Sequence, residues 1–157
     1  MATVELALAA IPAHVRTARL VAVSLGRRAG LDEESLDEVR LAVGEATSRA
    51  VGLHVVACPE EPIVVRFSDD EPGVFLIEVV DQAPVAGPAP NGASHDLALA
   101  ALAEYGDALD DSELGVLPPA VGLAVIDGIV DDVTVSHDGS GSSVRLAWAV
   151  PVATPDA

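Results

Sequence analysis

The regular apolar spacing between residues 32 and 53 constrains the fold of this chain more than any other feature. Apolar side chains recur there at alternating intervals of three and four residues: Leu36, Val39, Val43, Ala46, Ala50 and Leu53. These intervals match the 3.6-residue period of an α-helix, so the side chains form one stripe that must be buried. Asp32 suits the N-cap, and Glu33 and Glu34 suit the first turn. The pattern predicts a helix from Asp32 to about Val51 or Leu53.

A second helix is predicted just before this one. Pro12 suits the first turn of a helix, where its missing N–H costs nothing, and the helix would run to about Ala29. Arg27 and Arg28 fall in the last turn, where cations interact favourably with the helix dipole. Gly30 supplies the C-terminal stop.

The remaining regular segments are mostly β-strands. Alternating or β-branched runs predict strands at Thr3–Leu8, Ile63–Phe67, Val74–Val80, Val133–Ser136 and Ser143–Val150. The four later strands form two hairpins, with loops between them at Gln82–Gly92 and Asp107–Glu113 and helices at Asp96–Tyr105 and Pro118–Val130. We therefore predict an α/β two-layer sandwich, in which helices cover one face of a mostly antiparallel sheet. Residues 1–152 would form one domain, and residues 153–157 a flexible tail.

Composition excludes several classes of function. The chain has 157 residues, a net charge of −17 and an aromatic content of 3%. Such a charge repels nucleic-acid backbones, and so few aromatic rings offer no platform for stacking bases. No signal peptide or membrane-spanning run is visible, and the single Cys58 cannot form an internal disulfide. We expect a cytoplasmic protein without direct contact to nucleic acid or membrane.

Positive charge is concentrated in the first predicted helix. Between Pro12 and Leu31 there are four arginines and no acidic residue. Such a patch is unusual on an acidic chain, and it indicates a surface for recognition. The four His residues lie on unrelated segments, so we expect no metal site.

Four segments together resemble the GHKL ATPase superfamily and, more narrowly, its bacterial branch of anti-sigma factors and serine kinases that act by partner switching. The resemblance covers essentially the whole chain. Residues 37–51 (DEVRLAVGEATSRAV) look like the helix that carries the N-box, and residues 77–81 (IEVVD) look like the strand ending in the adenine-binding aspartate. Residues 121–133 resemble the last helix, and residues 141–146 the final strand.

The resemblance implies a nucleotide site and also shows where this chain departs from it. Glu45 matches the general base, and Asp81 matches the aspartate that accepts from the adenine amino group. Arg49 stands at the Mg²⁺-ligand position, and a guanidinium cannot coordinate a metal. Ala83 and Val85 replace two glycines expected after Asp81, and Gly122 alone remains of those before the last helix. We therefore expect a degenerate pocket of Arg49, Asp81 and Gly122, with no cofactor and ATP with Mg²⁺ doubtful.

The residues alone leave simpler interpretations open. Glu45 and Arg49 are four residues apart on one helix, a spacing that also suits an ordinary surface ion pair. In the alternative, Arg49 fills the former pocket, where it neutralises Glu45 or meets a phosphate without metal. Asp81 would equally suit a turn residue at a strand end.

The resemblance also implies a function in transcription regulation. A regulator of this kind binds a sigma factor and is released by a STAS-domain anti-anti-sigma protein, and the family implies a homodimer. An arginine of the first helix contacts the sigma factor in this family, which points to Arg19 and, more weakly, to Arg16. Two alternatives stay open: an active ATP-dependent serine kinase of a STAS protein with Glu45 as base, and a sensor of another nucleotide or an anion. The enzyme question is left undecided, leaning against activity.

Overall fold

The computed structural model describes residues 3–84, 92–93, 126 and 128–152. Its helices are α1 (Ala13–Ala29) and α2 (Glu33–Ala57). Its strands are β1 (Val4–Leu8), β2 (Ile63–Ser68), β3 (Val74–Asp81), β4 (Gly92–Ala93), β5 (Asp132–His137) and β6 (Ser142–Ala149). Within the described residues no helix is long and apolar enough to cross a membrane.

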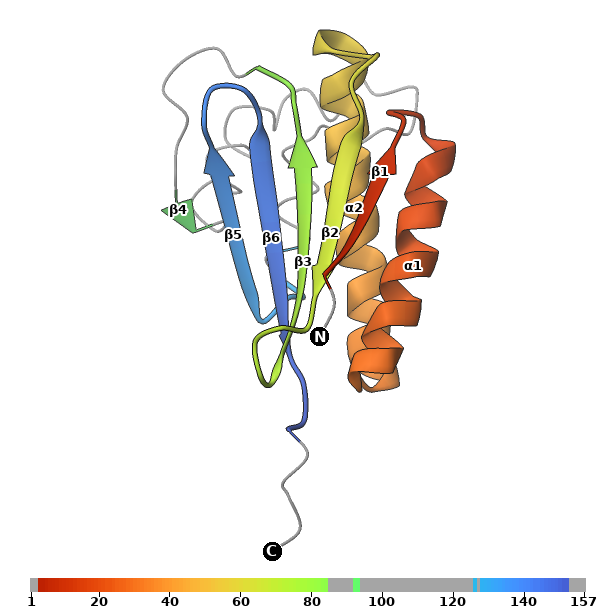
Figure 1. Cartoon of the computed structure of the whole chain (residues 1–157), viewed down its shortest axis with the longest axis vertical. Coiled ribbons are helices and arrows are strands. Elements are labelled where there is room, and N and C mark those ends of the chain that lie inside the picture. The colour runs from red at the N-terminus through yellow and green to blue at the C-terminus, as the bar shows by residue number, and fades with distance from the viewer. Residues whose placement is uncertain (1–2, 85–91, 94–125, 127, 153–157) are drawn as a thin grey trace, which may run out of the picture.

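The strands form a single antiparallel sheet in the order β1-β2-β3-β6-β5-β4. Figure 1 shows α1 and α2 side by side on one face of this sheet. The predicted two-layer α/β sandwich is therefore confirmed. The pairing of β3 with β6, far apart in sequence, brings the end of β3 beside the start of β6.

Side chains alternate across the sheet, as the strand period of two requires. The helix-facing side of the strands is buried: Ile63, Val65, Phe67, Phe75, Ile77, Val79, Val133, Val135, Val144, Leu146 and Trp148. On the opposite face Arg66 pairs with both Glu5 (3.0 Å) and Glu78 (3.1 Å) across three strands. These ion pairs are exposed, so they help to fix the strand register more than they stabilise the fold.

Helix α2 begins where the sequence predicts and ends later. The Asp32 side chain accepts a hydrogen bond of 2.8 Å from the backbone N–H of Ser35, which confirms the N-cap. The C-terminal end lies at Ala57 because the fully buried His54 anchors the last turn and its carbonyl accepts from Cys58. Val56 in that turn is 87% exposed. Apolar periodicity therefore stops before the helix does.

Helix α1 ends at the predicted glycine. Gly30 has a φ of 102°, and the backbone N–H groups of Gly30 and Leu31 both donate to the carbonyl of Gly26 at 3.1 Å. The buried face of α1 consists largely of small residues, Ala18, Ala22 and Gly26. Small side chains let α1 lie close against α2 and the sheet.

Other sequence predictions fall largely outside the described residues. The helix predicted at Asp96–Tyr105 lies wholly outside them, and so do the acidic loop Asp107–Glu113 and the tail 153–157. Of the helix predicted at Pro118–Val130, only residue 126 is described as helical. Gly92, predicted as the end of a loop, instead pairs with Val135 as part of β4.

The turn between β5 and β6 gives a first prediction. An added Cβ at Gly141 would lie 2.9 Å from the carbonyl carbon of Asp81 and closer still to its oxygen. Backbone atoms cannot yield as a flexible side chain can, so we expect Gly141→Ala to cost about 2–3 kcal/mol. Urea unfolding, followed by the fluorescence of the single tryptophan Trp148, measures this.

Gly139 in the same turn provides the matched control. Its φ is +84°, but an added Cβ would meet nothing within 4 Å. Asn tolerates this left-handed conformation, so Gly139→Asn should change the free energy of unfolding by less than about 1 kcal/mol. Equal losses in the two variants would contradict the close packing of Gly141 on β3.

Candidate functional site: a closed polar cluster at the end of β3

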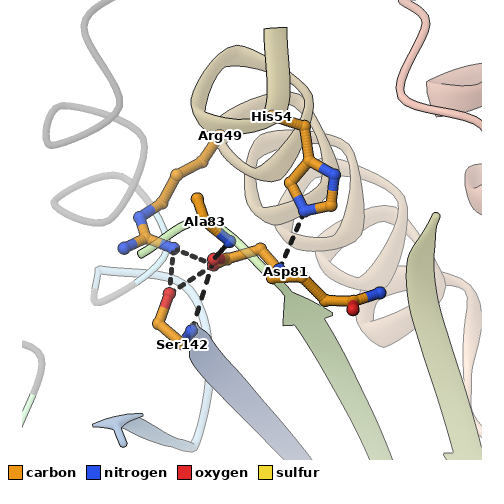
Figure 2. Close-up of polar contacts among 6 residues, drawn as sticks. Arg49, His54, Asp81, Ala83 and Ser142 are labelled. Carbon is orange, nitrogen blue, oxygen red and sulfur yellow. Dashed lines mark hydrogen bonds and ion pairs between the residues drawn. The ribbon is translucent and has the colours of Figure 1, made fainter. Parts of the chain in front are cut away.

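Three elements meet where β3 ends. Asp81 is the last residue of β3, and the strand register places it opposite Ser142, the first residue of β6. Helix α2 passes beside both, and Arg49 reaches from it towards them (Figure 2). Asp81 and Ser142 are buried, so the cluster is part of the interior as well as of a candidate site.

The Asp81 carboxylate accepts four hydrogen bonds from its own chain. Oδ1 accepts from the backbone N–H groups of Ala83 (3.1 Å) and Ser142 (3.3 Å). Oδ2 accepts from the Ser142 hydroxyl and from Arg49 Nη1 (3.3 Å). A carboxylate has about four acceptor positions, so intramolecular donors occupy all of them.

Arg49 is the cation of this cluster. Its side chain is 10% exposed and that of Asp81 is 2% exposed, so the ion pair is buried. Nη1 also donates to the Ser142 hydroxyl at 3.2 Å. Burial lowers the pKa of Arg49 from its usual value, and the negative charge of Asp81 opposes this shift. The guanidinium therefore stays charged and depends on Asp81 for compensation.

His54 fixes the backbone just beyond Asp81. The backbone N–H of Gln82 donates to His54 Nε2 at 2.9 Å, so Nε2 carries no proton. The other nitrogen, Nδ1, then donates to the carbonyl of Glu61, also at 2.9 Å. This neutral ring joins α2 to the end of β3 and to the loop before β2. It holds Asp81 in place against Arg49.

His137 lies at the edge of the same cluster, at the end of β5 and opposite Ser142 in the strand register. Burial lowers the pKa of His137, and the positive charge of Arg49 lowers it further, while Asp81 and Asp138 act in the opposite direction. A second cation beside Arg49 is thus disfavoured at neutral pH.

The structure brings together two of the residues that the sequence singles out, Arg49 and Asp81. Arg49 does not pair with Glu45: Glu45 is half-buried on α2 and belongs to none of the salt bridges between described residues. The local ion pair that the spacing also suited does not form, and Arg49 pairs instead with the buried carboxylate of Asp81. Gly122 lies outside the described residues.

The two arginines of the predicted recognition surface lie on α1. Arg16 is exposed, and Arg19, one turn further along, is half-buried against α2. Neither belongs to a salt bridge between described residues, whereas Arg27 pairs with Glu33 and Arg40 with Asp37. No three His, Cys, Asp or Glu side chains in the described part of the chain could hold a metal ion.

Sequence reasoning missed Ser142 and His54. Ser142 stands in a run of Gly and Ser that indicates only a turn, and its role follows from the β3–β6 register. His54 follows the apolar stripe of α2, which could have indicated that its ring is buried. Its two partners lie seven and 28 residues away, so the sequence does not identify them.

The fold and the cluster together define a two-layer α/β domain with a closed polar site at one end of its sheet. A sequence profile of the histidine kinase-like ATPase domain family matches residues 8–148. The chain therefore belongs to that family, which supports the resemblance to the GHKL superfamily. No curated protein sequence matches the chain.

Solved structures show the same fold. One match is the crystal structure of the RsbU and RsbW domains of Rv1364c from Mycobacterium tuberculosis, with a TM-score of 0.59 and 17% sequence identity. The match covers 98% of this chain and 35% of that chain, so this chain spans about a third of the length of its structural relative. At this identity the comparison establishes the fold alone.

The buried ion pair gives a prediction about stability. Asp81→Ala would leave Arg49, Ser142 and two backbone N–H groups without their acceptor, so we expect a loss of about 3–5 kcal/mol. Arg49→Met leaves Asp81 with three of its four donors, so we expect a smaller loss of about 1–3 kcal/mol. Urea unfolding of both variants measures the difference.

Arg40→Ala is the control for this comparison. The Arg40–Asp37 pair is exposed on the same helix, so its loss should cost less than about 1 kcal/mol. On this view Arg49 depends on the Asp81 carboxylate more than the carboxylate depends on Arg49. If Arg49→Met lowered the free energy of unfolding as much as Asp81→Ala or more, the view would be contradicted.

Proposed function

We propose that this chain is an anti-sigma-factor-like partner-switching regulator. It binds a sigma factor, a STAS-domain anti-anti-sigma protein, or both, in the cytoplasm and as a homodimer. It works without efficient ATP turnover, and its nucleotide motifs are degenerate. The RsbW domain of the similar mycobacterial structure supports the partner-switching part of this proposal.

The ion pair between Arg49 and Asp81 is the observation that carries the proposal. In the resemblance Asp81 would accept from adenine, yet its carboxylate already accepts from four donors of its own chain. Arg49 stands where a metal ligand would stand, and its positive charge repels Mg²⁺. Nucleotide binding would require breaking a buried ion pair, which argues for recognition of proteins over turnover of ATP.

The exposed side of α1 around Arg16, Arg19 and Leu20 supports the proposal of a protein partner. Arg16 and Arg19 have no acidic partner among the described residues of a chain with net charge −17. Leu20, which follows Arg19 on α1, is 63% exposed. Cations beside an exposed apolar side chain are typical of interface positions, where complementary charge also steers association.

Recovery of the partner from the native host tests the proposal. Tagged chain, isolated under gentle conditions, should retain a sigma factor or a STAS-domain protein. The double variant Arg16→Ala, Arg19→Ala should recover at least tenfold less sigma factor, because its cations would no longer meet the partner. Quantitative mass spectrometry of the bound fraction measures this.

Arg28→Ala is the matched control, since Arg28 is an exposed arginine on another side of the same helix. It should recover as much sigma factor as the unmodified chain. Recovery of neither protein class by the unmodified chain would contradict the proposed function. Equal recovery by the double variant would remove Arg16 and Arg19 from the binding surface.

A further inference from the structure

Gly44 in the middle of α2 faces the side chain of Arg19 on α1. An added Cβ at Gly44 would lie 2.6 Å from Cζ of Arg19 and closer still to Nε and Nη2. No larger residue therefore fits while the guanidinium keeps this position. Gly44 leaves the space in which the guanidinium of Arg19 lies against the backbone of α2.

Glycine is an unfavourable choice for this place in a helix. It is less favourable than alanine in a helix interior, because its backbone loses more conformational freedom on folding. Gly44 lies eleven residues inside a helix of 25 residues, far from either end, so no turn or cap requires it. The close approach of the Arg19 side chain is the structural reason for a glycine at this position.

The Nε–H of the Arg19 guanidinium lacks an acceptor among the described residues. Arg19 Nε is buried and has no hydrogen-bond partner among the described residues, and Arg19 takes part in none of their salt bridges. A buried N–H without a partner costs free energy, and it is far more costly on a charged group. Among the described residues no carboxylate forms a salt bridge with this guanidinium, so a carboxylate carried by a partner would compensate its charge.

The surroundings indicate the chemistry of that acceptor. Arg16 and Leu20 lie on the outer side of α1, with Leu20 63% exposed. Leu41, one turn before Gly44 on α2, is 42% exposed. A cation between exposed leucines suits a carboxylate flanked by apolar side chains, and bidentate pairing with a carboxylate uses the fork of an arginine fully.

We infer that Gly44 is a positioning residue for partner recognition: it seats Arg19 flat on α2 and so presents the guanidinium to a carboxylate on an apolar surface of the partner protein. This inference rests on the proposed function, in which Arg19 belongs to the binding surface. Gly44 itself need not touch the partner. Its effect on affinity acts through the position of Arg19.

The position of the Arg19 side chain against Gly44 is tested first in the absence of a partner. In ¹H–¹⁵N spectra of the full chain, the Nε–H resonance of Arg19, assigned by its absence in Arg19→Lys, should exchange slowly with water. Gly44→Ala should shift this resonance and speed its exchange at least tenfold, because the side chain is displaced into solvent. Gly52→Ala, two turns further along α2, should leave it unchanged. An unchanged Arg19 resonance in Gly44→Ala would contradict the claim that Gly44 sets the position of the Arg19 guanidinium.

Affinity then tests the role in recognition. The probe is each purified sigma factor of the host, titrated with the full chain. Arg19→Ala should weaken the affinity at least tenfold, and Gly44→Ala should weaken it at least fivefold. The double variant should bind within twofold of Arg19→Ala, since both changes remove the same contact. Losses that multiply would overturn the inference, because Gly44 would then act independently of Arg19.

Controls separate this inference from loss of the fold and from the proposed function. Gly44→Ala should melt at or above the temperature of the unmodified chain, because alanine favours the helix and a displaced arginine side chain can move away. Gly44→Ser provides a second variant with the same expected losses. An unmodified chain that binds neither a sigma factor nor a STAS-domain protein contradicts the proposed function, and the Arg19 resonance then still decides whether Gly44 positions Arg19. An unmodified chain that binds only a STAS-domain protein overturns the role of Arg19 and Gly44 in recognition of a sigma factor.

Discussion

The rest of this structure depends on one buried interaction, the ion pair between Arg49 on α2 and Asp81 at the end of β3. It joins the helix layer to the sheet at the point where β3 and β6 run side by side. Burial of two charges is costly, and the pair is tolerated because every acceptor position of the carboxylate is used. Gly141 approaches the backbone of Asp81 closely, and His54 accepts a hydrogen bond from the backbone of Gln82.

The same interaction connects stability with function. The four donors of its own chain occupy the acceptor positions that the Asp81 carboxylate would offer a nucleotide, and the positive charge of Arg49 repels a divalent cation. The chain belongs to the histidine kinase-like ATPase domain family and keeps that fold. Although the polar cluster at the end of β3 is closed, the outer surface of α1 and α2 is still accessible, and there Arg19 lies on Gly44. The recognition that we propose for this surface needs no chemistry at the closed cluster.

Much of the fold could be predicted from the sequence, and the site could be predicted in part. The apolar stripe of α2, the cap at Asp32 and the glycine stop at Gly30 are local signals, and the structure confirms each of them. Contacts that depend on distant strands could not be predicted. The partner of Arg49 is 32 residues away in sequence, and Ser142 becomes its neighbour only through the β3–β6 register. The helix spacing therefore left open an i, i+4 pair with Glu45, whereas the sheet supplied the buried acceptor Asp81.

Calorimetric titration of the full chain with Mg-ATP tests the central claim most directly. If the Arg49–Asp81 pair closes the nucleotide site, the unmodified chain should show a Kd weaker than about 1 mM, which corresponds to less than about 4 kcal/mol of binding free energy. Binding in the micromolar range would contradict this view of the site. It would mean that the ion pair opens readily and that the chain is a working ATP-binding domain.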